Sequence, residues 1–135
     1  MDILRNDCPI NFYSIPGFLE CIFKKEFDIC AMQPIKDILP KELVPGITGY
    51  YAHGAKLTLG YVEIKAGSNL PEHHHVHEQI TYIIEGQLNM VIGGQSYSLK
   101  TGMYHVIPSN VPHNAFAVTD CKLIDVFNPV REDYK

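Results

Sequence analysis

Short β-forming segments separated by turns constrain the fold of this chain more than any other feature of its sequence. From residue 47 onward, runs rich in β-branched and aromatic residues recur at short intervals and end at glycines such as Gly54 and Gly67. One expected strand ends at residue 53, and the others cover 57–65, 79–85, 88–92, 96–99, 103–107, 113–118 and 122–127. The Gly93-Gly94 pair predicts a hairpin. This pattern predicts an all-β barrel or sandwich.

The first part of the chain differs from the rest in residue composition. Residues 1–45 mix aromatic residues and cysteines with the prolines Pro9, Pro16, Pro34, Pro40 and Pro45. The only helical candidate there, residues 34–43, is stopped early by Pro40. We expect residues 1–45 to form an N-terminal arm of short strands and turns, which packs on or swaps with a barrel formed by residues 46–135. A chain of 135 residues suits one compact domain.

Composition and charge exclude several classes of protein. The net charge is −4 and no basic patch dominates, which argues against binding to nucleic acids or anionic membranes. No apolar run reaches membrane-spanning length, and the N-terminus lacks the basic and apolar regions of a signal peptide. Free thiols in a reducing compartment are indicated by the absence of a CxxC pair among Cys8, Cys21, Cys30 and Cys121. A cytoplasmic protein is expected.

A cluster of histidines predicts a metal site. Four of the seven histidines lie within residues 73–77, and His113 lies downstream in the run PSNVPH. Imidazole is the commonest metal ligand near neutral pH because it needs little or no deprotonation there. His73 and His75, two residues apart on an extended segment, project from the same face. A third imidazole from elsewhere in the fold would complete a pocket for one divalent ion.

The remaining histidines are expected to have lesser roles. His74 alternates to the opposite face of the segment and should be exposed. His77 lies in the following turn, where a place beside the ligands or in solvent is expected rather than coordination. His53 and His105 are expected to be ordinary strand or turn residues.

The spacing of glycines around the histidines resembles two motifs of the cupin superfamily. The first motif, G-x5-H-x-H-x3-E-x6-G, is matched by Gly67, His73, His75, Gln79 and Gly86. The second motif, G-x5-P-x-G-x2-H-x3-N, is matched by Gly102, Pro108 and His113. The chain departs from the first motif at Gln79, which replaces glutamate, and from the second at Asn110 and Ala117. The resemblance covers about residues 47–130.

This resemblance implies a double-stranded β-helix, also called a jelly-roll barrel, with one divalent transition metal near an open end. The ligands that it implies are His73, His75, Gln79 and His113. Nitrogen and amide-oxygen donors suit Zn, Ni, Fe, Co or Mn, and the sequence does not choose among these metals. A homodimer is also expected, since cupins commonly pair through sheet edges.

The glutamine at position 79 has a chemical consequence. A glutamate ligand would cancel one unit of metal charge, whereas an amide oxygen cancels none. Three histidines and Gln79 therefore favour Lewis-acid polarisation of a bound carbonyl or hydroxyl over stabilisation of a higher oxidation state. The alternative is that Gln79 is merely tolerated in a barrel that binds no metal.

A second candidate group lies near the C-terminus. On a strand, Asp125 and Phe127 share a face with Leu123. An aspartate among apolar residues is costly to bury unless it is paired or functional. Arg131, beyond an Asn-Pro turn, could reach the cavity mouth and bind a carboxylate with two hydrogen bonds. Alternatively, Asp125 and Arg131 form a structural pair that pins the tail, and the residues alone leave the two interpretations even.

A closer resemblance favours the functional interpretation. The stretches HEQITYIIEGQLNMVIGG, IPSNVPH and IDVFNPVREDY are similar to small cupins of pectin and alginate breakdown, which convert 4,5-unsaturated monouronates to linear keto forms. This similarity implies a sugar-acid substrate, with Asp125, Phe127 and Arg131 in substrate handling or catalysis. A non-catalytic sugar-binding cupin is the first alternative, and an iron-dependent dioxygenase is the second. The arm at residues 1–45 is not explained by the resemblance.

Overall fold

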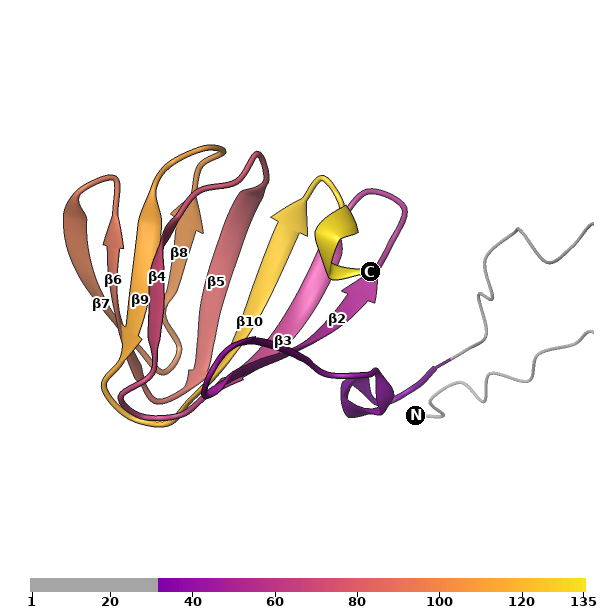
Figure 1. The fold of residues 1–135 in the computed structure, drawn as a ribbon, viewed down its shortest axis with the longest axis horizontal. Helices are drawn as coiled ribbons and strands as arrows, with labels where there is room; N and C mark the ends of the chain where they lie inside the picture. Colours follow the sequence, from indigo (N-terminus) through magenta and orange to yellow (C-terminus); the bar gives the residue numbers. More distant parts are fainter. Residues whose placement is uncertain (1–31) are drawn as a thin grey trace, which may run out of the picture. The chain divides into compact units, whose positions relative to one another are not determined.

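The structure is a computed structural model that describes residues 32–135. Within that range the chain forms ten strands and two short 3-10 helices (Figure 1). The elements in chain order are η2 (Ile35–Asp37), β1 (Lys41–Val44), β2 (Ile47–His53), β3 (Thr58–Ile64), β4 (Asn69–His73), β5 (Glu78–Glu85), β6 (Gln87–Ile92), β7 (Gln95–Lys100), β8 (Tyr104–Ile107), β9 (His113–Ala117), β10 (Cys121–Asn128) and η3 (Glu132–Tyr134). No helix among these residues is long and apolar enough to cross a membrane.

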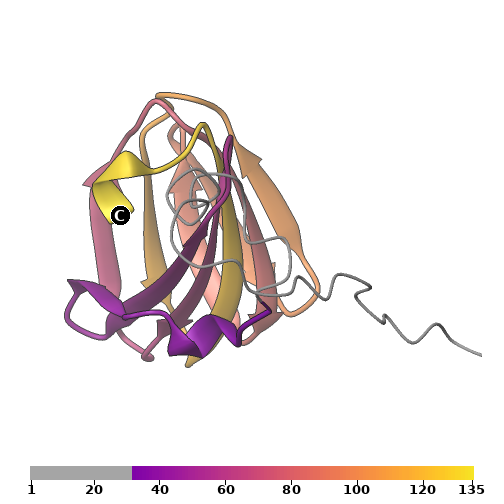
Figure 2. The same ribbon diagram turned by 90° about the vertical axis from the view of Figure 1, so that its right-hand side faces the viewer.

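The strands form two antiparallel sheets that face each other (Figure 1 and Figure 2). Six strands follow the order β1-β2-β3-β10-β5-β8, and four follow the order β4-β9-β6-β7. Strands far apart in sequence lie side by side, since β10 pairs with both β3 and β5. Apolar side chains from both sheets fill the space between them. The fold is therefore the predicted all-β jelly-roll barrel, or double-stranded β-helix.

Alternation along the strands explains how the barrel acquires both its core and its polar interior groups. In β3 every second residue from Thr58 to Ile64 is buried. In β5 the residues Gln79, Thr81 and Ile83 point inward while their neighbours are exposed. The larger core residues include Ile47, Val62, Ile64, Ile83, Leu88, Met90, Ile92, Leu99, Ile107 and Leu123. The same alternation that builds this core places two polar side chains of β5 inside the barrel.

Glycines permit two local features of the fold. The hairpin between β6 and β7 turns at Gly93 and Gly94, whose φ angles of 56° and 82° lie in the left-handed region, as the sequence predicts. Gly49 on β2 and Gly60 on β3 leave room for the ring of Tyr51, because a Cβ at Gly60 would lie 2.7 Å from that ring. Tyr51 can therefore lie close against the sheet inside the barrel, where it is 5% exposed.

The start of the described chain belongs to the six-stranded sheet. Residues 41–44, within the region predicted as an arm, form β1 and pair with β2 of the same chain. The helical candidate at residues 34–43 corresponds to a single 3-10 turn, since Pro40 prevents its extension and β1 begins directly afterwards. Residues 1–31 of the predicted arm lie outside the described residues, and Cys8, Cys21 and Cys30 are among them. The arm and its boundary at residue 45 therefore stay predictions.

Candidate functional site

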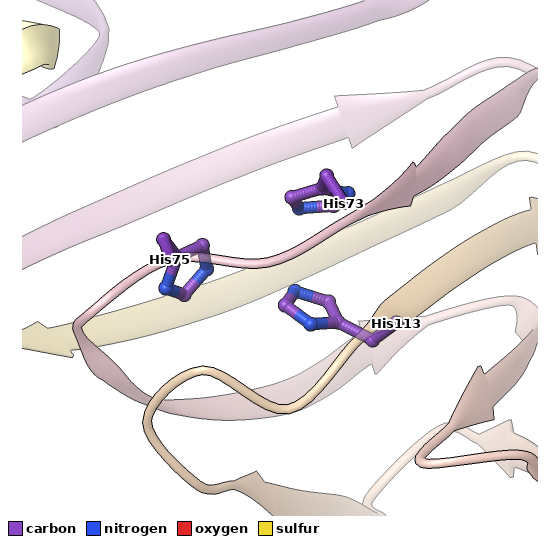
Figure 3. A group of neighbouring side chains, drawn as sticks. All are labelled: His73, His75 and His113. Carbon is purple, nitrogen blue, oxygen red and sulfur yellow. The ribbon is translucent and has the colours of Figure 1, made fainter.

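Three histidines converge at one end of the barrel (Figure 3). His73 ends β4, His113 begins β9, and the two residues lie opposite each other in the register of this strand pair. His75 lies in the loop between β4 and β5. One ring nitrogen from each histidine lies within 4.8 Å of the others, which is close enough for all three to hold one metal ion.

The ring orientations match what a metal ligand requires. Each Nδ1 lies 2.8–3.1 Å from a main-chain carbonyl oxygen, and those oxygens belong to Pro71, His77 and Val111. A carbonyl oxygen can only accept a hydrogen bond, so each Nδ1 carries the proton and each Nε2 presents its lone pair. Backbone hydrogen bonds of this kind fix the tautomer and the ring orientation of metal-binding histidines.

Burial favours the neutral forms of His75 and His113. Burial lowers the pKa of His113, and burial followed by the charge of Arg131 lowers the pKa of His75 to about 4. His113 is 2% exposed, and its Nε2 is buried without a hydrogen-bond partner among residues 32–135. An unpaired buried nitrogen costs about 1–3 kcal/mol. A cation bound by the three Nε2 atoms would remove that cost, so the histidines fit a divalent metal.

Gln79 adds a fourth donor atom to the cluster. Its side chain is buried on β5, and its Oε1 lies 3.1 Å from Nε2 of His75. The Nδ1 of His75 carries the proton, so two lone-pair atoms face each other across this distance. Such a contact is unfavourable unless a proton or a cation lies between the two atoms. Two atoms that bind the same ion, each at about 2.1 Å, lie a similar distance apart. Gln79 therefore fits the same metal as the histidines.

Asp125 lies beside Gln79 inside the barrel. It faces Thr81 across the β10–β5 pair, and its Oδ1 accepts hydrogen bonds from the Thr81 hydroxyl at 2.6 Å and from Gln79 Nε2 at 3.0 Å. Burial raises the pKa of Asp125 to about 6, although these two hydrogen bonds and the charge of Arg131 act in the opposite direction. A carboxyl group with such a pKa can gain or lose a proton near neutral pH.

Arg131 follows β10 and is 6% exposed. Its guanidinium lies 4.9 Å above the ring of Phe127 and 3.9 Å above that of Tyr134. Its Nε and Nη2 donate hydrogen bonds of 3.0 and 2.8 Å to the two carboxylate oxygens of Asp133. Arg131 thus pairs with Asp133 and not with Asp125, so the structural Asp125–Arg131 pair considered from the sequence is wrong.

One cavity inside the barrel brings all seven predicted site residues together. They are His73, His75, Gln79, His113, Asp125, Phe127 and Arg131. The cavity measures about 40 Å³ and is also lined by Tyr134, from the short η3 helix at the same end of the barrel (Figure 1 and Figure 2). A larger hollow of about 520 Å³ elsewhere on the surface has mostly polar and charged lining residues and contains none of the seven.

The other histidines lie where the sequence predicts. His74 is exposed, and the His77 ring lies edge-on to that of His75 at 5.4 Å between centroids. His53 Nδ1 lies 2.9 Å from the hydroxyl of Thr58, and His105 packs against the ring of Tyr97, away from the cluster.

Sequence reasoning missed three residues that complete the site. Thr81 could have been found, since it lies two residues after Gln79 on a strand and therefore shares its face. Asp133 and Tyr134, which contact Arg131, gave no such signal because they lie in a 3-10 turn without a strand period.

Comparisons with known proteins agree with this fold. A family model described as "Cupin domain" matches residues 60–127, half of the chain. The pectin degradation protein KdgF of Dickeya dadantii (strain 3937) is 34% identical over 71 residues, which are 52% of this chain. The chain spans 64% of the length of that protein.

Two solved structures are similar over most of the described residues. KdgF from Halomonas sp. superposes with a TM-score of 0.69 at 29% identity, over 74% of this chain and 94% of that one. An RmlC-like cupin from Shewanella frigidimarina NCIMB 400 gives a TM-score of 0.69 at 26% identity, over 74% of this chain and 91% of that one.

Proposed function

The chain belongs to the cupin family, and from that premise we propose that it is a metal-dependent enzyme of pectin breakdown that converts an unsaturated uronate monosaccharide to its linear keto form. The observation that carries the proposal is one cavity lined by four candidate metal-donor groups, a carboxyl group and a guanidinium. The similarity to the pectin degradation protein KdgF supports the substrate class. The chain spans less than two thirds of that relative, so its activity here is our proposal.

The candidate ligands are the Nε2 atoms of His73, His75 and His113 and the Oε1 of Gln79. When bound, a divalent metal would supply Lewis-acid polarisation of a substrate oxygen, and this uncharged ligand set leaves its charge undiminished. Zn, Ni, Fe, Co and Mn all remain candidates.

The residues beyond the ligands have distinct proposed roles. Asp125 moves a proton as general acid or base, which its pKa of about 6 supports. Its Oδ1 is occupied by Thr81 and Gln79, so Oδ2 is the oxygen that exchanges the proton. Arg131 binds the substrate carboxylate through its guanidinium, and Phe127 forms the apolar wall beside it.

The size of the cavity adds a condition to this proposal. Small-molecule pockets usually measure about 300–1,000 Å³, whereas this cavity measures about 40 Å³. A sugar acid therefore needs more space than this cavity offers, and Tyr134 and Arg131 of the C-terminal tail are among the side chains that line it. We propose that substrate binding moves the tail that carries them.

Replacing Asp125 tests the proposed function. We expect Asp125→Asn to lower kcat on an unsaturated uronate by about 10²- to 10⁴-fold, since general acid–base catalysis contributes about that much. Metal content, measured by elemental analysis, should stay at the wild-type level, because the amide oxygen of asparagine can still accept the hydrogen bonds from Thr81 and Gln79. The exposed Asp37 provides a control, and Asp37→Asn should keep full activity. Undiminished turnover by Asp125→Asn would reject the role of Asp125 in proton transfer. If the wild-type chain binds the uronate without consuming it, the protein is a binding module and not an enzyme.

Two further expectations accompany the proposal. A homodimer is supported by the outer face of β5 and β8, where large apolar side chains are 37–67% exposed, namely Ile80, Tyr82, Ile84, Tyr104 and Val106. A cytoplasmic location stays a prediction; within the described chain, the one cysteine, Cys121, is buried with a free thiol.

A further inference from the structure

Thr81 occupies a position between the candidate metal ligands and Asp125. It is 1% exposed and lies two residues after Gln79 on β5. Its Oγ1 lies 2.9 Å from Gln79 Nε2 and 2.6 Å from Asp125 Oδ1. The amide nitrogen of Gln79 can only donate, so the hydroxyl accepts from it and gives its own single proton to the carboxylate.

This arrangement determines which way the Gln79 amide points. The Nε2 of Gln79 donates to Thr81 and to Asp125, which uses both of its hydrogens. The amide oxygen is then left on the opposite side, 3.1 Å from Nε2 of His75. A flipped amide would set its oxygen against the carboxylate oxygen of Asp125, which is unfavourable. It would also turn its nitrogen toward the histidines, and an amide nitrogen cannot bind a cation.

We propose that Thr81 is a positioning residue that, together with Asp125, holds the amide oxygen of Gln79 toward the Nε2 atoms of the histidines and thereby sets the affinity for a divalent ion. The inference rests on the metal site of the proposed function. Thr81 itself binds neither metal nor substrate. Its hydroxyl keeps the Asp125 carboxylate in place, and it leaves the Gln79 amide only one favourable orientation.

The hydroxyl is the feature to remove. Thr81→Val has nearly the same shape but lacks it, whereas Thr81→Ser keeps it. The dissociation constant for Zn²⁺ or Ni²⁺ is measured on the metal-stripped full chain by competition with a chromophoric chelator. We expect Thr81→Val to bind about 10- to 100-fold more weakly than wild type, the usual effect of losing a group that orients a ligand, and Thr81→Ser to stay within about threefold.

Thr58 provides a matched control for the loss of a buried hydroxyl. It is fully buried inside the same barrel, but its hydroxyl contacts His53 and accepts from the backbone N–H of Arg131 instead of contacting a candidate ligand. Thr58→Val should therefore lower the melting temperature of the metal-free protein while leaving the ion's dissociation constant within about threefold of wild type. A merely structural role of Thr81 predicts the same outcome for Thr81→Val.

The outcomes separate this inference from the proposed function. Wild-type affinity in a folded Thr81→Val chain overturns the role of Thr81 alone. A wild-type chain that binds no divalent ion overturns both the metal site and the role of Thr81. If Thr81→Val does not fold, Thr81→Ala removes the hydroxyl without placing a second methyl against Asp125, and the same comparison applies.

Discussion

The barrel interior and the C-terminal tail differ in whether their polar groups have partners within the chain. In the interior, His113 Nε2 is buried without a partner among the described residues, and His75 Nε2 faces the oxygen of Gln79. In the tail, Arg131 donates two hydrogen bonds to Asp133 and lies over an aromatic ring on η3. The interior therefore presents donor atoms that a cation could bind, whereas the tail pairs its own charges.

The two aspartates near Arg131 show the same contrast. Burial raises the pKa of Asp125 to about 6, whereas the hydrogen bonds from Arg131 lower that of Asp133 to about 2. Asp125 can thus change its protonation state near neutral pH, and Asp133 stays ionised except in strong acid. We therefore propose proton transfer for the interior carboxyl group only, whereas the tail carboxylate keeps a fixed charge near neutral pH.

The strongest test of this comparison removes a ligand from the interior. We expect His113→Ala to weaken binding of a divalent ion by more than about 100-fold. Loss of a residue that only orients a ligand already weakens metal affinity by about 10- to 100-fold, and His113 is itself a candidate ligand. The measurement is metal content by elemental analysis after dialysis. Added Zn²⁺ should raise the melting temperature of the wild-type chain but not that of the variant, since binding stabilises only a folded site.

His74→Ala is the matched control for that experiment. His74 lies in the same histidine run but is exposed, so its removal should leave metal content unchanged. Equal metal content in His113→Ala and wild type would mean that the unpaired nitrogen is not a ligand. The difference between interior and tail would then give no support to a metal site.

The fold could be predicted from the sequence wherever burial alternates along a strand. β3 follows this rule over its whole length, β5 follows it from Glu78 to Ile84, and the paired glycines define the β6–β7 hairpin. The sequence does not delimit β1 or β4. β1 is an edge strand of four residues between Pro40 and Pro45, and β4 contains Pro71, so neither has an uninterrupted β-forming run.

Seven residues of the candidate site could be predicted from the sequence, but their hydrogen-bond partners could not. Motif spacing selects the three histidines and Gln79, and strand alternation selects Asp125 and Phe127. The partner of Arg131 depends on the path of the backbone after β10, where η3 brings Asp133 to the guanidinium. No periodic pattern encodes that turn. The role of Thr81 likewise depends on the β10–β5 register, which sets it opposite Asp125.

A smaller effect is expected from the tail. Asp133 occupies the guanidinium fork to which a substrate carboxylate would bind, so the two compete. Asp133→Asn should lower KM for an unsaturated uronate by up to about fivefold without changing kcat, because exposed ion pairs are worth about 0.2–1 kcal/mol. Glu132→Gln, which removes an adjacent exposed charge paired with Lys135, should leave KM unchanged. A higher KM in Asp133→Asn would show that Asp133 positions Arg131 for the substrate.

The smallest effect concerns stability in acid. The pKa of Asp133 is about 2 in the folded chain, against about 3.9 for an unfolded aspartate. The ion pair with Arg131 therefore stabilises the fold fully above about pH 4, and its contribution is lost as the pH falls through 2. The Asp133 side chain is 58% exposed, so solvent screening keeps this contribution below about 1 kcal/mol.

Denaturant unfolding of Asp133→Asn and wild type at pH 6 and pH 2 measures this contribution. The free energy of unfolding of the variant should be lower than that of wild type at pH 6, and the two values should converge at pH 2, because protonation of Asp133 removes the same charge as the substitution. A difference of equal size at both pH values would instead assign the loss to altered packing around Arg131. The tail carboxylate would then stabilise the fold through its shape and not through its charge.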